Sequence, residues 1–166
     1  MTLSEIIKMG IDPALALLPA KMDTPEARIM LLAIGLQESR FEQRRQLVGD
    51  PPRPVGPAKS FWQAEQGGGM VQGVRLHVAT SAAAAHLYQA RGVPARDAAI
   101  WDAIERDDVL AAGLARLLLW SDPGRLPAVG DEQGAWSLYL RTWRPGKPHA
   151  QTWPGLYARA VAEVTP

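Results

Sequence analysis

The sequence predicts a mainly α-helical domain built around one buried helix. Strand-like alternation of apolar and polar residues is nearly absent, whereas apolar residues at helical spacing recur in several segments. Residues 27–36 are apolar on every side of a helix, which is typical of a central helix surrounded by the rest of a domain. The chain has 166 residues, 47% of them apolar, so we expect one domain over residues 1–166 that buries a sizeable core.

The N-terminal 20 residues are expected to form one or two short helices around a break at Asp12-Pro13. Their apolar residues should pack on the outside of the main body. These residues are Ile6, Ile7, Met9, Leu15, Leu17 and Leu18.

The central helix has a clear start and an unusual end. Thr24 can cap it, Pro25 suits the first helical position, and Glu26 places negative charge in the first turn. At its far end stands Glu38. The negative end of the helix dipole and apolar surroundings both raise the pKa of a carboxyl group, which is what a general acid working near neutral pH requires.

A structural interpretation of Glu38 stays open beside the catalytic one. A glutamate at a helix end is commonly solvated, and Arg40, Arg44 and Arg45 are close enough in sequence to form an ion pair with it.

The segment after the central helix contains several prolines, which forbid a helix over residues 43–59. Short extended pieces near residues 46–48 and 53–55 are compatible with the sequence, so we expect a rigid loop or a small hairpin. This segment is either a functional element or an ordinary surface loop. Residues 60–66 are expected to form one helical turn, and the glycines at 67–69 to form a turn that lacks the features of a phosphate loop.

Five further helices are predicted from caps, periodicity and terminating glycines or prolines. They cover residues 82–91, with Thr80 or Ser81 as the cap, and residues 95–104, 107–119, 131–143 and 154–164. No internal repeat or domain linker is evident.

Composition argues against several classes of function. The net charge is +1, so the protein has no strong electrostatic field that would attract nucleic acid or an anionic membrane. The chain has no cysteine, and His77, His86 and His149 lack the spacing of metal ligands, so we expect neither a metal nor a cofactor. No apolar stretch is long enough for membrane insertion, and the N-terminus lacks the pattern of a secretory signal, which predicts synthesis in the cytoplasm.

Glu38-Ser39, followed later by Phe61-Trp62-Gln63, resembles the lysozyme-like lytic transglycosylase family. That family carries a catalytic Glu-Ser at the end of a central helix, then a Gly-Leu-Met-Gln type segment, then an Ala-Tyr-Asn type segment in a later helix. Gln63 matches the second segment, although Ser60, Phe61 and Trp62 stand where Gly, Leu and Met are usual. Tyr139 is the best match to the third, without the following Asn. The whole pattern also resembles small phage-encoded proteins of that superfamily.

The resemblance implies an all-α, lysozyme-like fold that cleaves peptidoglycan glycan strands between N-acetylmuramic acid and N-acetylglucosamine. Glu38 would serve as general acid and then general base. Hydrolysis commonly needs a second carboxylate, and Asp50 and Glu65 are the nearest candidates in sequence. Transglycosylases manage without one, because the acetamido group of the substrate assists and its 6-hydroxyl attacks. A phage virion or lysis partners would bring such an enzyme to the cell wall.

Four other residues are candidate substrate contacts. Trp62 and Tyr139 present aromatic rings that suit the apolar faces of sugars, although such residues are also common in cores. Gln63 could hold an acetamido group through its amide, and Ser39 could bond Glu38 or sugar. Two alternatives remain: a non-catalytic glycan-binding or virion structural protein with the same fold, and a helical interaction protein in which Glu38 is an ordinary surface residue.

Overall fold

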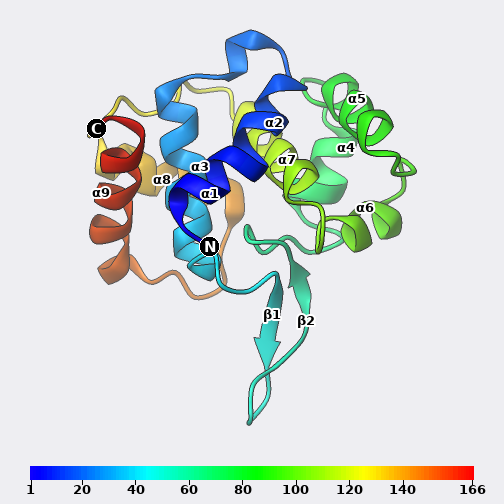
Figure 1. The fold of residues 1–166 in the computed structure, drawn as a ribbon, viewed down its shortest axis with the longest axis horizontal. Coiled ribbons are helices and arrows are strands. Elements are labelled where there is room, and N and C mark those ends of the chain that lie inside the picture. Colours follow the sequence, from blue (N-terminus) through cyan, green and yellow to red (C-terminus); the bar gives the residue numbers. More distant parts are fainter.

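The computed structural model describes residues 1–166 and is mostly helical, with one two-stranded antiparallel sheet (Figure 1). The expectation of an all-α chain is therefore too strict, whereas the expected small hairpin is present. The elements are α1 (Leu3–Ile6), the π-helical η1 (Ile7–Ile11), α2 (Asp12–Ala16), η2 (Ala20–Met22), α3 (Pro25–Ser39), β1 (Arg45–Val48), β2 (Arg53–Lys59), η3 (Gly69–Gly73), α4 (Val74–Leu76), α5 (Ser81–Arg91), α6 (Asp97–Ala103), α7 (Asp108–Ser121), α8 (Glu132–Trp143), η4 (Ala150–Thr152) and α9 (Trp153–Val164).

Helix α3 is the central helix that the sequence predicts. The Thr24 hydroxyl accepts a hydrogen bond from the amide of Ala27 at 3.2 Å and caps its start. Nearly every residue from Ala27 to Leu36 is buried, because α9 and α7 pack on different sides of the helix. Burial on all sides explains why this helix needs no polar face.

Helix α7 is the second helix of the core. Asp107 caps it through the amide of Leu110 at 2.9 Å, and α5, α2 and η1 pack around it. Its buried residues include one charged side chain, Arg116. No helix of the protein combines the length and the apolarity needed to cross a membrane.

The N-terminal helical path does not break at Asp12-Pro13, contrary to the sequence prediction. The wider turn of η1 lets the amide of Asp12 bond to the carbonyl of Ile7. Pro13 therefore lies in the first turn of α2, where the amide hydrogen that proline lacks is not required. Ile6 and Leu15 are buried in the core, while Met9 stays 60% exposed.

Residues 60–66 do not form the expected helical turn. Instead, the backbone groups of Lys59 and Ala64 bond to each other in both directions, at 2.9 and 2.7 Å. Ser60 and Gln63 take positive φ values of 68° and 51°, which a right-handed helix does not allow. The result is a tight turn that leaves the end of β2 beside the end of α3.

The helical segment of η3 and α4 was not predicted, because glycines at 67–69 favour a turn. Met70, Val71 and Val74 are buried there, and their burial outweighs the low helix propensity of the flanking glycines. Gly69 lies so close to α7 that an added Cβ would stand 2.9 Å from Cδ1 of Leu118. Glycine at this position thus lets the segment pack closely against α7 without displacing the Leu118 side chain.

Candidate active site

A large cleft opens where α3 ends. It has a volume of about 1200 Å³ and is lined by the last residues of α3, the base of the β1–β2 hairpin, residues 63–73, the end of α7, and α8 with the loop that follows it. A cleft of this size exceeds the usual range for a single small ligand, roughly 300–1,000 Å³, and suits an extended molecule.

Glu38 lies in this cleft as the second-last residue of α3 and is partly buried. The hydroxyl of Tyr139 on α8 donates a hydrogen bond to Oε1 of Glu38 at 2.7 Å. Burial raises the pKa of the Glu38 carboxyl above its usual range, and the hydrogen bond from Tyr139 offsets only part of this rise. The site therefore favours a protonated Glu38 at higher pH than an exposed glutamate would allow.

The neighbouring arginines do not pair with Glu38. Arg44 forms an ion pair with Asp108 at 2.7 Å, Arg45 approaches Glu105 at 3.5 Å, and Arg40 bonds the carbonyl of Leu36. The ion-pair interpretation of Glu38 is therefore wrong for this structure.

Tyr139 is fixed by aromatic packing. Its ring stacks on Trp153 with 5.3 Å between centroids and an interplanar angle of 11°, and it contacts Trp136 as well. Burial, reinforced by the neighbouring Glu38, raises the pKa of Tyr139, so its hydroxyl keeps its proton and remains a donor. The ring is only 2% exposed, so the prediction that it stacks on a sugar is wrong; what Tyr139 offers the cleft is its hydroxyl.

Ser39 holds the 59–64 turn against α3. Its hydroxyl donates to the carbonyl of Phe61 at 2.7 Å and accepts from the amide of Phe41 at 3.2 Å. Both bonds tie backbone groups together directly after Glu38. Ser39 lines the cleft, as a candidate contact should, but its hydroxyl is already engaged within the protein.

Trp62 lies in the core and does not line the cleft, which corrects the prediction that it contacts substrate. Its side chain is 0% exposed, and its indole nitrogen donates to the carbonyl of Leu31 at 2.9 Å. The rings of Phe61 and Trp62 both meet the ring of Phe41 edge to face. The Phe41 ring in turn covers Gly35, where an added Cβ would stand 2.1 Å from its Cζ. These contacts lock the end of α3 and thereby position Glu38.

Gln63 lines the cleft together with Glu38. Its amide nitrogen donates to the carbonyl of Ser60 at 2.8 Å, which orients the side chain and leaves the amide oxygen as an acceptor. Its φ of 51° is uncommon for a residue other than glycine. Positive φ values recur around the cleft, at Arg40 and Arg144, and such backbone strain is concentrated in functional sites of other proteins.

The carboxylates other than Glu38 are in different situations. Glu65 is exposed on the cleft lining, whereas Asp50 lies in the turn of the hairpin, outside that lining. Asp122, which sequence reasoning missed, lines the cleft and accepts two bonds from Arg141 at 2.8 and 3.1 Å. Those bonds hold the pKa of Asp122 below its usual range. Glu38 is thus the carboxyl group of the cleft whose environment favours the neutral acid.

Basic residues line the same cleft, and the sequence analysis named only Arg40 and Arg45 among them, as possible ion-pair partners of Glu38. Arg40, Arg144 and Lys147 line the cleft; the first two terminate α3 and α8 in left-handed conformations. An arginine that follows the last turn of a helix and precedes a proline, as Arg144 does, is the signal that could have indicated this position.

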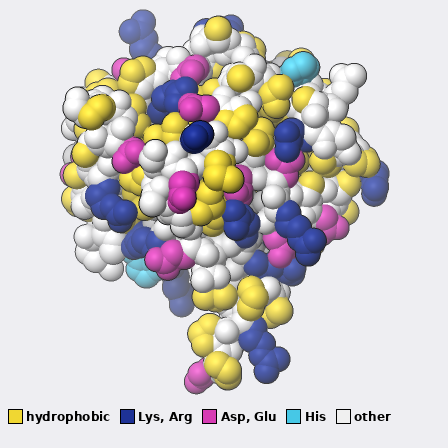
Figure 2. Space-filling model, viewed as in Figure 1, with side chains coloured by type: hydrophobic (Ala, Val, Ile, Leu, Met, Phe, Trp, Pro, Cys, Tyr) yellow, Lys and Arg dark blue, Asp and Glu magenta, His cyan; other side chains and the backbone are white.

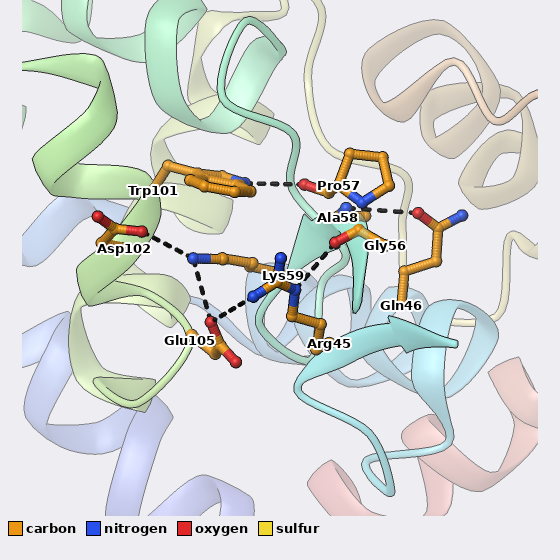
Figure 3. A network of polar contacts seen from close by, with 9 residues as sticks. All are labelled: Arg45, Gln46, Gly56, Pro57, Ala58, Lys59, Trp101, Asp102 and Glu105. Carbon is orange, nitrogen blue, oxygen red and sulfur yellow. Dashed lines mark hydrogen bonds and ion pairs between the residues drawn. The ribbon is translucent and has the colours of Figure 1, made fainter. Parts of the chain in front are cut away.

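The hairpin base is anchored to α6 by a polar network around Lys59 (Figure 3). The ammonium group of Lys59 lies 2.8 Å from Asp102, 3.1 Å from Glu105 and 3.6 Å from the ring centroid of Trp101. The indole of Trp101 donates to the carbonyl of Pro57 at 2.8 Å. Because Lys59 begins the turn that carries Gln63, this network fixes one wall of the cleft.

Beyond its base, the hairpin projects away from the helical body (Figure 1). Apolar side chains gather on it (Figure 2), and Leu47, Val48 and Val55 are 43%, 37% and 59% exposed.

No three histidine, aspartate or glutamate side chains gather closely enough to hold a metal ion. Comparisons with known proteins returned no match: no family model, no curated protein and no solved structure corresponds to this chain. The function proposed below therefore rests on the residues of the cleft, their geometry and the resemblance of the sequence motifs.

Proposed function

We propose that this chain has a lysozyme-like fold and cleaves the β-1,4 bond between N-acetylmuramic acid and N-acetylglucosamine in peptidoglycan. The observation that carries the proposal is Glu38: a carboxyl group with a raised pKa, at the end of a buried helix, open to a large cleft. Cleavage of a glycosidic bond requires an acid that protonates the leaving oxygen, and a raised pKa keeps that proton available to higher pH than in an ordinary glutamate.

The reaction is proposed to be non-hydrolytic. Glu38 donates its proton to the glycosidic oxygen as the bond to the anomeric carbon breaks, and the acetamido group of the substrate supports that carbon. The resulting carboxylate of Glu38 then accepts the proton of the sugar's 6-hydroxyl as this oxygen attacks, which leaves a 1,6-anhydro end and restores the acid. Such a scheme needs one carboxyl group. It is supported by the situation of the other cleft carboxylates, because Asp122 is held by two bonds from Arg141 and Glu65 is exposed.

Tyr139 and Gln63 have distinct roles in this scheme. The Tyr139 hydroxyl donates to Oε1 of Glu38, so it orients the carboxyl group and stabilises its charged form between the two steps. The free amide oxygen of Gln63 is available to accept from an acetamido N–H of the glycan. The resemblance of the sequence to phage-encoded proteins supports peptidoglycan glycan strands as the substrate. It also supports a virion or lysis partners as the means by which the protein reaches the cell wall.

A second candidate is a non-catalytic glycan-binding or virion structural protein. The virion structural role is the part of this alternative with support, because the Ser39 hydroxyl and the rings of Trp62 and Tyr139, all candidate sugar contacts, are engaged within the protein.

Digestion of purified peptidoglycan, followed by mass spectrometry of the released muropeptides, separates these functions. We expect products that end in 1,6-anhydro-muramic acid, which lack one water relative to reducing ends. Reducing ends as the main product would overturn the transglycosylase assignment, and Glu65→Gln and Asp122→Asn would then identify the hydrolytic partner. Retention of the protein on peptidoglycan without any release would favour the binding protein.

A further inference from the structure

A second pocket lies away from Glu38, between the start of α3 and the end of α7. It has a volume of about 460 Å³ and is lined by residues on both helices and by the loop after α7. Its position and its lining make it a separate site: among its lining residues, Asp122 alone is shared with the cleft.

Arg116 forms the charged part of this pocket and lacks a counter-ion. Its side chain is 2% exposed, and its Nε donates to the carbonyl of Met22 at 2.7 Å. The terminal nitrogen Nη1 is buried without a partner, no hydrogen bond involves Nη2, and no carboxylate pairs with the guanidinium. Buried charges in proteins are normally paired, so a guanidinium held in this way calls for an anion.

The pKa of Arg116 agrees with that description. Burial lowers it to about 10, and distant attraction from Asp23 compensates only in part, because Asp23 is itself bonded to Arg28. Arg116 nevertheless remains charged at neutral pH, because a group with a pKa of about 10 loses its proton only well above pH 7.

The other charges of the pocket favour an anion. Lys21 and Arg125 line it and form no ion pair, and Lys21 lies 5.3 Å from the ring centroid of Trp120. Glu26 and Asp122 line it as well, but Asp122 is already bonded to Arg141. Cations are thus in excess, so the pocket attracts an anion.

The rest of the lining is apolar and sets the shape of a ligand. Leu119, Trp120, Leu126 and Ala128 contribute it. We propose that this pocket binds a small organic carboxylate, whose carboxylate group bonds to the terminal nitrogens of Arg116 and whose apolar body packs against Trp120 and Leu126. Guanidinium and carboxylate groups match in geometry, and the pocket is large enough for a body beyond the carboxylate. This proposal does not depend on the function of the cleft.

The test is an NMR titration of the whole protein, following the Nε–H of Arg116 and the indole N–H of Trp120. The probe is N-acetylalanine; N-acetylalaninamide has the same body without the charge, and inorganic phosphate is the alternative anion. We expect saturable shifts of both signals with N-acetylalanine and none with the amide. Equal shifts with acid and amide, shifts that do not saturate, or tighter binding of phosphate would each overturn the carboxylate assignment.

Variants locate the binding. Arg116→Met keeps the approximate length of the side chain and removes the charge, so the saturable shift of Trp120 should disappear. Arg159→Met, at an exposed position on α9 outside the pocket, is the matched control and should bind as the wild type does. If Arg116→Met does not fold, the exposed rim double variant Lys21→Met/Arg125→Met should weaken binding by about tenfold, the usual scale of lost charge-assisted bonds. Unchanged affinity in the rim variant, or in a folded Arg116→Met, would refute the site.

Discussion

Helices α3 and α7 form the core of the protein, and each holds one ionisable group largely out of water. Helix α3 ends with Glu38, which opens on the large cleft and accepts a bond from a neutral donor, Tyr139. Helix α7 carries Arg116 in its middle, where its guanidinium bonds one backbone carbonyl and lies 5.4 Å from the ring centroid of Trp120 but has no counter-ion.

The difference between these two groups lies in how each can respond to burial. A carboxyl group whose pKa is raised takes up a proton at higher pH than an exposed one, and the protein then has a proton to transfer. A guanidinium cannot lose its proton near neutral pH, so the energetic cost of burying its charge is compensated by an anion. One helix is therefore suited to acid–base chemistry and the other to holding a carboxylate.

The largest expected effect is on activity. Glu38→Gln preserves the shape of the side chain but removes the proton, so peptidoglycan cleavage should fall by about 10²- to 10⁴-fold, the usual contribution of general acid catalysis. Release of soluble muropeptides measures the effect. Glu65→Gln, at an exposed position of the same cleft, is the control and should retain activity. A fully active Glu38→Gln protein would remove the catalytic role from α3.

Glycine substitutions distinguish the two helices by their packing. An added Cβ at Gly35 would stand 2.1 Å from the ring of Phe41, whereas at Gly113 on α7 it would stand 2.7 Å from the end of the flexible Leu87 side chain. We expect Gly35→Ala to cost about 1–3 kcal/mol of unfolding free energy, as overpacking commonly does. Gly113→Ala should cost less, because Leu87 can turn aside and alanine favours the helix. Urea denaturation measures both, and equal costs would show that the end of α3 is not tightly locked.

Stability should respond to pH in opposite directions at the two groups. The pKa of Glu38 is higher in the folded protein, so the folded state binds more protons than the unfolded state, and stability falls as pH rises from the ordinary glutamate pKa through the folded one. The pKa of Arg116 is lowered to about 10, so its contribution rises with pH only above that value. Carboxylates with lowered pKa values, such as Asp122, contribute the opposite slope, so the Glu38 effect is measured by chemical denaturation of wild type and Glu38→Gln from pH 4 to 8. The stability of the wild type relative to Glu38→Gln should fall as pH rises, and a constant difference would contradict the raised pKa of Glu38.

The smallest expected effect is that of Tyr139→Phe. The hydroxyl of Tyr139 lowers the pKa of Glu38, so its removal should raise that pKa further and move the alkaline limb of the pH–activity profile to higher pH. The pH dependence of muropeptide release measures this shift. A limb that moves to lower pH would mean that the hydroxyl acts in the opposite sense.

Much of the fold follows from local sequence. Caps at Thr24 and Asp107 and apolar runs broken only by single arginines define α3 and α7, because long apolar helices can be recognised without tertiary information. The helical segment after Gly69 and the tight turn at 59–64 could not be predicted in this way. Both depend on contacts with distant residues: Leu118 in the first case and Ser39 in the second.

The candidate site was predictable in part for the same reason. The position of Glu38 at the end of an apolar helix is a local signal, and the structure places it in a cleft with Gln63. The inward direction of Trp62 depends on the positive φ values of Ser60 and Gln63, which sequence alone does not reveal. Arg116 stands among leucines that periodicity turns inward, yet a charged residue there is expected to face water, so its burial was missed.

The most direct test of the central claim is the titration of the Glu38 carboxyl by ¹³C NMR, with the resonance assigned by its absence from Glu38→Gln. We expect an apparent pKa above the ordinary glutamate value of about 4.3. The titration should also be seen in the amide signals of residues next to the cleft. A pKa at or below the ordinary value would mean that Glu38 is charged throughout the neutral range, and it would contradict its role as a general acid.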